Sequence, residues 1–130
     1  MPTATDAPTL PELKEVIAAY NNHDVDAIVD SFAEDGVFEL SRGPDPWGTR
    51  LSGQKQIGDF LRERFRVTTD MQWETLDLWI TGNRAVLEFL VTGTGKDGKP
   101  IKAYGCDLWT FKGKKVLRKD TYWKSKEVAL

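Results

Sequence analysis

The sequence predicts an α+β fold in which three N-terminal helices pack on a curved antiparallel sheet of four to six strands. Two observations predict this class. Apolar residues recur at helical spacing up to Phe65, whereas from Met71 onward they alternate with a period of two. Turn signals also arrive regularly in the second half, at Gly82-Asn83, Asp97-Gly98 and Lys112-Gly113. Strands joined by such short turns form an antiparallel meander.

The size and charge of the chain are those of a globular protein. Its 130 residues are 40% apolar and 29% charged, with a net charge of −2. The chain thus lacks the excess of positive charge that is typical of proteins that bind nucleic acid or an anionic membrane. We expect residues 1–8 to be a mobile tail and residues 9–130 to form a single domain. The N-terminus lacks the features of a signal peptide and no stretch is long enough to span a bilayer, so we expect a cytoplasmic protein.

The first two helices have recognisable ends. Thr9 and Glu12 have the spacing of a capping box, and the helix that they begin is expected to end at Asn21-Asn22. Asp24 can cap a second helix, whose apolar stripe continues to Phe32. The two helices therefore form a pair with a short link.

The next segment combines a short strand with an irregular loop. Residues 37–40 have the composition of a strand, and the Gly- and Pro-rich residues 41–53 are expected to be loop. This loop carries Trp47, which either forms a lid or pocket rim or packs down on the core. Ser52 or Gly53 then begins the third helix, whose run of charges is expected to be a solvated face.

The register of the sheet follows by counting from the turns. The four predicted strands lie near 71–81, 84–95, 99–111 and 114–124. If each turn is a two-residue link, Asp77 lies opposite Glu88, and Glu88 lies opposite Asp107. The last turn places Arg118 opposite Asp107, or Lys119 if there is a one-residue bulge. In either case a cation from the fourth strand lies beside Asp107.

This register gathers three carboxylates on one apolar face of the sheet. Side chains expected on the same face include Trp73, Ala103, Trp109, Thr121 and Trp123. Facing carboxylates raise one another's pKa, so one can stay protonated while another acts as base. The alternative is a buried ion pair with the remaining carboxylates at the rim, in water. The opposite face is also apolar, and we expect it to meet a second subunit in a homodimer.

The single cysteine and the single histidine are both interpreted as structural. Cys106 is expected to be a small buried hydrophobe, and His23 lies in the turn between the first two helices, where it can bond to a helix end. One cysteine and one histidine do not make a zinc site. We therefore expect neither a metal nor another cofactor.

Several stretches of the chain resemble a known superfamily. They are NNHDVDAIVDSFAEDGVFE, LSGQKQIGDFLRERF, CDLWTF and KDTYWK. With them the chain resembles the nuclear transport factor 2-like superfamily, and within it the SnoaL-like and steroid Δ-isomerase-like branch. The resemblance implies a cone-shaped sheet wrapped over helices, with a small apolar ligand at its open end, commonly in a homodimer.

The resemblance also assigns roles to single positions. Asp107 matches the protonated aspartate with which steroid isomerases bind a dienolate oxygen, and Trp123 matches a pocket aromatic residue. The isomerase base belongs at Leu40 and its tyrosine near Val16, so both are missing. Glu39 could serve as base if the short strand shifts by one residue.

Together these features favour a cofactor-independent acid/base enzyme of isomerase, cyclase, lyase or hydratase type on a small hydrophobic carbonyl compound. Asp107 would bind or protonate the developing oxyanion, and Glu88 or Asp77 would move the proton. Lys119 would set the charge balance. The residues expected to line the ligand are Trp47, Trp73, Ala103, Trp109, Thr121, Trp123 and Glu39. Two alternatives are a non-catalytic binding module for a lipophilic molecule, and a dimer whose cavity is filled by its own side chains.

Overall fold

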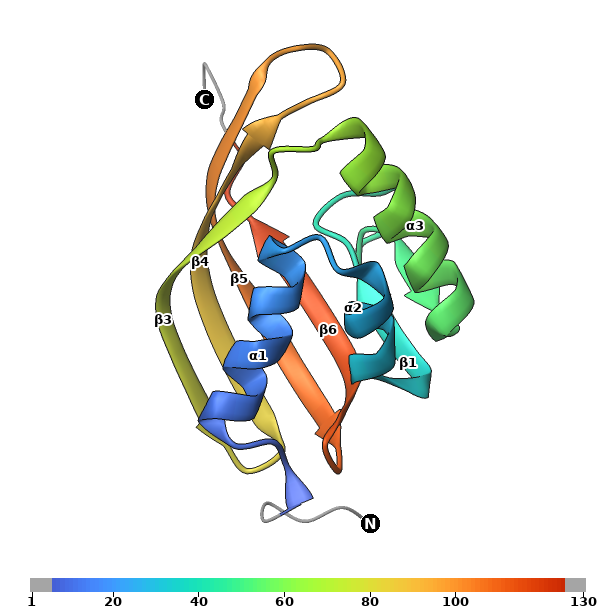
Figure 1. Ribbon diagram of the computed structural model, residues 1–130, viewed down its shortest axis with the longest axis vertical. Coiled ribbons are helices and arrows are strands. Elements are labelled where there is room, and N and C mark those ends of the chain that lie inside the picture. The colour runs from blue at the N-terminus through green and yellow to red at the C-terminus, as the bar shows by residue number, and fades with distance from the viewer. Residues whose placement is uncertain (1–5, 126–130) are drawn as a thin grey trace.

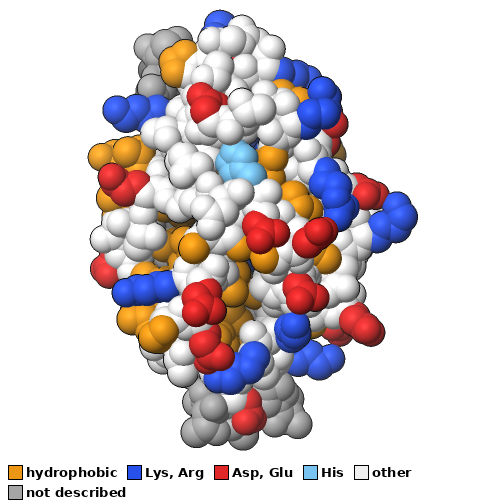
Figure 2. Space-filling model, viewed as in Figure 1, with side chains coloured by type: hydrophobic (Ala, Val, Ile, Leu, Met, Phe, Trp, Pro, Cys, Tyr) orange, Lys and Arg blue, Asp and Glu red, His pale blue; other side chains and the backbone are white. Residues whose placement is uncertain are grey.

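The computed structural model describes residues 6–125, in which three helices cover one face of a curved six-stranded sheet (Figure 1). The elements are α1 (Leu10–Asn21), α2 (Val25–Ser31), β1 (Phe32–Glu39), β2 (Arg50–Ser52), α3 (Gly53–Val67), β3 (Gln72–Thr81), β4 (Arg84–Thr94), β5 (Pro100–Lys112) and β6 (Lys115–Trp123). The predicted α+β class is confirmed. Acidic and basic side chains are interspersed with apolar ones over the helical side (Figure 2).

The strand order of the sheet is β2-β1-β6-β5-β4-β3. All neighbouring strands are antiparallel except β1 and β6, which pair in parallel. The sheet is therefore mixed. β1 belongs to the helical half of the chain, so its pairing with β6 joins residues that are far apart in the sequence. Turn signals report only links between consecutive strands, so they gave no sign of this pair.

The predicted helix starts are confirmed in detail. The Thr9 backbone N–H donates to Glu12 Oε1 at 2.9 Å, and the Glu12 backbone N–H donates to Thr9 Oγ1 at 3.3 Å, which completes the capping box. The Asp24 carboxylate accepts from the Ala27 backbone N–H at 3.2 Å and caps α2. Residues 1–5 of the predicted tail lie outside the described residues.

The prediction that α2 includes Phe32 is wrong. The helix ends at Ser31, and Phe32 is extended, with φ −83° and ψ 144°. Its ring is 1% exposed and stacks on Phe38 at 6.2 Å. Phe32 is equally apolar in a helix or a strand, so the pairing with β6 decides its conformation.

Residues 41–53 contain more structure than the predicted loop. They include β2, which pairs with the end of β1, and an isolated bridge between Asp45 and Gly48. Gly48 has φ +82°, and a Cβ there would lie 2.1 Å from the Leu40 carbonyl oxygen, so the tight turn requires glycine. Trp47 is 44% exposed and lies under the Arg50 guanidinium at 4.7 Å, so it does not pack into the core.

The register between β3 and β4 is as predicted, but the register between β4 and β5 is wrong by one residue. Asp77 lies opposite Glu88, beyond a bulge at Leu76. The next link runs from Gly95 to Lys99 and is longer than two residues, so Leu87, and not Glu88, faces Asp107. A slip of one residue turns every side chain to the other face. Glu88 therefore points away from the helices, whereas Asp107 points toward them.

The last hairpin also differs from its prediction. Its turn falls one residue later than predicted, a bulge follows between Thr110 and Phe111, and Asp107 faces Thr121. Neither Arg118 nor Lys119 lies directly opposite Asp107. Lys119 faces Trp109 on the same side of the sheet, and from there it reaches Asp107 diagonally.

The core lies between the helices and the inner face of the sheet. Its largest fully buried side chains are Trp109, Phe32, Phe38, Phe89 and Phe111. Among the helices in residues 6–125, none is both long and apolar enough to cross a membrane.

Candidate functional site

A buried chain of three polar side chains lies on the inner face of β5 and β6. Lys119 Nζ donates to Thr121 Oγ1 at 3.1 Å, and the Thr121 hydroxyl donates to Asp107 Oδ1 at 2.6 Å. Lys119 Nζ also lies 3.4 Å from Asp107 Oδ1. The three residues are 4%, 8% and 2% exposed. The predicted cation beside Asp107 is confirmed as Lys119.

Aromatic rings surround the Lys119 ammonium group. Its Nζ lies 4.1 Å from the ring centre of Phe38, 4.9 Å from that of Tyr20 and 5.5 Å from that of Trp109. Ring faces attract a cation, but they stabilise its charge far less than water does. Burial therefore lowers the pKa of Lys119, and the nearby Asp107 carboxylate opposes that shift.

Asp107 shows the opposite shift for the same reason. Burial raises the pKa of its carboxyl group, and the Lys119 charge and the Thr121 hydrogen bond oppose the rise. The pKa values of the two partners thus move toward each other. The Thr121 hydroxyl, which accepts from Lys119 and donates to Asp107, links the two groups.

A small cavity beside this chain holds about one water molecule or one ligand oxygen atom. Its volume is about 10 Å³. It is lined by Ile17, Tyr20, Trp73, Leu87, Asp107, Trp109 and Lys119. The buried Tyr20 hydroxyl and Trp109 Nε1 have no hydrogen-bond partner among residues 6–125. Burial, followed by the Asp107 charge, raises the pKa of Tyr20, so its hydroxyl stays a neutral donor.

A much larger hollow of about 830 Å³ opens at the end of the sheet near the β4–β5 hairpin, at the top of Figure 1. Its wall includes Leu40, Phe60, Arg64, Ala103 and Trp123. Phe38 lies between this hollow and the small cavity, since it packs on Phe60 at 6.2 Å and its ring centre is 4.1 Å from Lys119 Nζ. We call this larger hollow the mouth.

The predicted site residues fall into three groups. Asp107, Lys119, Thr121, Trp109 and Trp73 surround or line the small cavity. Ala103 and Trp123 line the mouth. The remaining residues, Glu88, Asp77, Trp47 and Glu39, line neither.

Glu88 and Asp77 are exposed on the outer face of the sheet, so the predicted row of three carboxylates does not form. Glu39 is fully buried, but it has two arginine partners. Arg50 Nε donates to Glu39 Oε2 at 2.9 Å, and Arg118 pairs with Glu39 Oε1. A carboxylate held by two guanidinium groups is a poor candidate for a base.

Two site residues were not predicted. Tyr20 belongs to the apolar stripe of α1, where a tyrosine resembles any core residue. The feature that could have indicated a role in the site is its hydroxyl, which lies on the face that the helix buries. Arg64 lies in the charged run Arg62–Arg66, and only its position in line with Phe60 and Leu61 on α3 could have separated it from its solvated neighbours.

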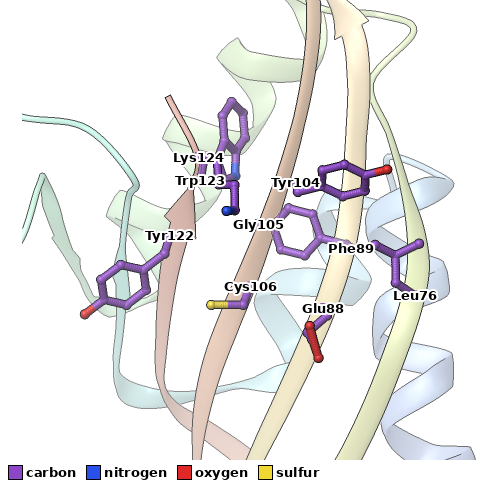
Figure 3. A pocket seen from close by; sticks show the side chains of 9 residues that line it. All are labelled: Leu76, Glu88, Phe89, Tyr104, Gly105, Cys106, Tyr122, Trp123 and Lys124. Atoms are coloured by element: carbon purple, nitrogen blue, oxygen red, sulfur yellow. The ribbon is translucent and has the colours of Figure 1, made fainter. Parts of the chain in front are cut away.

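An apolar groove of about 420 Å³ lies on the outer face of the sheet (Figure 3). Its wall includes Leu76, Glu88, Tyr104, Cys106 and Tyr122. Cys106 is half-buried, so the prediction of a buried side chain is wrong. Burial, followed by the charges of nearby carboxylates, raises the pKa of its thiol, which makes it a poor nucleophile.

His23 has a structural role, as predicted, although its partner is the residue just before β3 and not a helix end. Its Nε2 lies 2.6 Å from the Met71 carbonyl oxygen, and its ring stacks on Phe65 at 4.0 Å. Within residues 6–125, no group of three or more histidine, cysteine or acidic side chains is arranged to bind a metal ion.

Comparison with known proteins identifies the family. Residues 13–119 match the model of the SnoaL-like domain. The chain belongs to the SnoaL-like domain family. The resemblance predicted from the sequence is thereby confirmed, with a SnoaL-like cone of helices and sheet. A search of curated proteins found no match.

Solved structures share this SnoaL-like fold at low sequence identity. A hypothetical protein with a ketosteroid isomerase-like fold from Catenulispora acidiphila, in complex with trimethylamine, has a TM-score of 0.78 and 17% identity over 90% of this chain and 88% of that one. A putative polyketide cyclase from Sinorhizobium meliloti has a TM-score of 0.69 and 22% identity over 91% and 97%. TerC, co-crystallised with polyporic acid, has a TM-score of 0.73 and 18% identity over 88% and 90%. At these identities the likeness establishes the fold alone.

Proposed function

We propose that this protein is an acid/base enzyme that moves a proton on a small hydrophobic carbonyl compound. The observation that carries the proposal is the buried chain from Lys119 through Thr121 to Asp107, beside a Tyr20 hydroxyl with no hydrogen-bond partner among residues 6–125. Perturbed titratable groups that adjoin a hollow are typical of catalytic sites.

Each group has a distinct role in the proposed reaction. The Asp107 carboxylate takes a proton from the carbon next to the carbonyl group, and its raised pKa makes it a stronger base. The C–H electron pair forms a C=C bond and the carbonyl π pair moves to the oxygen, so that the substrate becomes an enolate. The Tyr20 hydroxyl donates to that oxygen, and the Lys119 charge, which first balanced Asp107, now balances the enolate. Asp107 then returns the proton to the same or a neighbouring carbon.

This scheme uses one carboxylate instead of three. Glu88 and Asp77 lie on the other face of the sheet, so neither can move the proton. Phe60, Ala103 and Trp123 of the mouth would hold the body of the substrate, and the small cavity has room for its carbonyl oxygen. Similar structures that contain trimethylamine or polyporic acid support a small molecule as the ligand.

The test is deuterium exchange into hydrophobic ketones such as acetophenone and 2-tetralone in D2O, followed by proton NMR. We expect the wild type to accelerate exchange over buffer and Asp107→Asn to lose roughly 100-fold or more of that rate. Glu88→Gln is the matched control and should keep the wild-type rate, because its side chain faces away from the site. Exchange that is equally fast in Asp107→Asn would overturn the proposed role.

One observation favours a non-catalytic binding module instead. The small cavity has a volume of only about 10 Å³, so aromatic side chains fill most of the inner cone. A ligand held wholly in the mouth would not reach Asp107. Binding of the ketones without any deuterium exchange would decide for this second function.

We also propose a homodimer through the outer face of the sheet. That face exposes four large apolar side chains, Leu76, Trp79, Tyr104 and Tyr122, at 49%, 43%, 56% and 53%. The groove of Figure 3 lies among them. A contiguous apolar surface of this kind is typical of a protein interface, and a second copy of the chain is its simplest occupant.

A further inference from the structure

The mouth carries a charge opposite in sign to that of the whole chain. Six basic residues line it: Arg42, Arg64, Lys96, Lys99, Lys102 and Lys124. Asp97 is the one carboxylate among its lining residues. The whole chain has a net charge of −2. A concave site lined by one sign of charge attracts ligands of the other sign and raises their local concentration.

Arg64 is the innermost of these cations. Its guanidinium lies 4.6 Å from the ring centre of Phe60 and 5.9 Å from that of Trp123. Burial lowers the pKa of Arg64 to about 10, and Asp107 and Tyr20 oppose that shift. The side chain is thus charged at neutral pH, and it lies near enough to the small cavity to interact with the groups there.

The Arg64 side chain also has neither an ion pair nor a hydrogen bond within residues 6–125. Its neighbours on α3 differ: Arg62 pairs with Asp26 at 3.2 Å, and Arg66 pairs with Glu63. Arg50 and Arg118 share Glu39. A half-buried guanidinium has lost part of its hydration. Since no carboxylate pairs with it in residues 6–125, its N–H groups can donate hydrogen bonds to a ligand.

The surroundings of Arg64 also restrict the body of such a guest. Phe60, Trp123, Leu40 and Ile101 give the mouth apolar walls, and the hollow of about 830 Å³ has the size of a typical small-molecule site. Apolar walls around one fork of donors suit a molecule with a hydrophobic body and one anionic group.

We propose that the ligand is a hydrophobic organic acid, whose carboxylate or acidic enol group binds the Arg64 guanidinium in the mouth. This inference rests on the proposed function, since it names the class of molecule that the same site takes. It places the anionic end of the ligand at Arg64 and directs the rest toward Lys119 and Asp107. Neutral and cationic molecules of the same shape bind more weakly, because they leave the guanidinium without a partner.

The test uses two fluorescent probes with the same ring system. One is 1-anilinonaphthalene-8-sulfonate, which is an anion, and the other is N-phenyl-1-naphthylamine, which is neutral. Dissociation constants are measured for the wild type, Arg64→Met and Arg62→Met. We expect the wild type to prefer the anionic probe by roughly tenfold or more, as one charged hydrogen-bonded contact gives. Arg64→Met should lose most of that preference and still bind the neutral probe.

The matched control is Arg62→Met, on the same helix but with its side chain 56% exposed and paired to Asp26. It should keep the wild-type preference. An equal preference in Arg64→Met and the wild type would overturn the inference, as would a wild type that binds both probes equally. Equal binding of both probes by the wild type would still support the hydrophobic site of the proposed function. If neither probe binds to the wild type, the proposed site falls together with the inference.

A second measurement covers the case in which Arg64→Met does not fold. The wild-type preference for the anionic probe is then followed as the salt concentration rises, and Arg64→Lys is tested beside it. We expect salt to reduce the preference and the lysine variant to keep part of it. A preference that salt leaves unchanged would contradict an electrostatic origin.

Discussion

Lys119 and Asp107 form an ion pair that is almost fully buried. The two side chains are 5% and 4% exposed and lie 3.4 Å apart. Removing one partner from such a pair leaves a buried charge without compensation, whereas replacing both by apolar groups is often tolerated.

Lys119→Met is therefore expected to lower the free energy of unfolding by about 3 kcal/mol at pH 7. Lys119→Met/Asp107→Leu should recover most of that loss. Without Lys119, the pKa of Asp107 in the folded state rises further above its unfolded value. The stability that this group contributes is then present at low pH and is lost as the pH rises through the folded pKa.

The measurement is urea unfolding of both variants at pH 7 and pH 5. The loss in Lys119→Met should be smaller at pH 5, because Asp107 takes up a proton there more readily. A loss of the same size in the single and the double variant would show that Lys119 packs but does not pair.

Sequence reasoning at this scale succeeded where a residue was out of place and failed where it looked ordinary. Asp107 and Lys119 stood out as charges in apolar runs, and they do meet. Tyr20 looked like one more apolar residue of its helix, and Arg64 looked like its solvated neighbours. Their roles depend on what α1 and α3 face, which no local pattern reports.

Among the elements, α1 is the one whose start depends most clearly on charge. Glu12 accepts from the Thr9 backbone and from Lys114 Nζ, both at 2.9 Å, so that it ties the helix start to the β5–β6 link. These contacts, the Thr9 backbone bond first, lower the pKa of Glu12 from 4.5 to about 2.

A carboxylate with a lowered folded pKa stabilises the fold above its unfolded pKa and loses that effect as the pH falls. We therefore expect Glu12→Gln to be less stable than the wild type at pH 7, with a difference that shrinks between pH 4.5 and about 2. Urea unfolding at several pH values measures it. The control is Glu15→Gln, because Glu15 has no ion pair or side-chain hydrogen bond in residues 6–125. A Glu12→Gln difference that does not change with pH would contradict the account.

The elements also show how far turn signals determine a sheet. The strands from β3 to β6 were predicted to within two residues at their ends, because alternation and turn residues are local. The register of β5 against β4 and β6 was not, because the link from Gly95 to Lys99 and the bulge after Thr110 each shift the count. The shift between β4 and β5 places Glu88 on the other face, so the predicted row of three carboxylates does not form.

At the scale of the whole molecule, the two faces of the sheet carry different side chains. The inner face holds the polar chain and the mouth, and the outer face holds the exposed aromatic surface and the groove. The fold class and the family could be predicted from the sequence, since both follow from the order of elements. The division of the carboxylates between the two faces could not, because it depends on the register.

The outer face leads to a prediction about assembly. We expect the wild type to have twice the chain mass of 14.7 kDa in light scattering after size exclusion, and Tyr104→Glu/Tyr122→Glu to have the mass of one chain. Two buried carboxylates without partners would oppose association. Leu10→Glu is the control, because Leu10 is also exposed, at 39%, but lies on α1. A wild type that stays monomeric at high concentration would contradict the dimer.

The central claim is that Asp107 is a buried carboxyl group whose protonation responds to a hydrophobic guest in the mouth. The most direct measurement is the pH titration of its side-chain carboxyl carbon by NMR, assigned with Asp107→Asn, with and without neutral N-phenyl-1-naphthylamine. The account predicts a midpoint above the usual 3.8, which moves when the probe fills the mouth. A midpoint at or below 3.8 in both samples would contradict it.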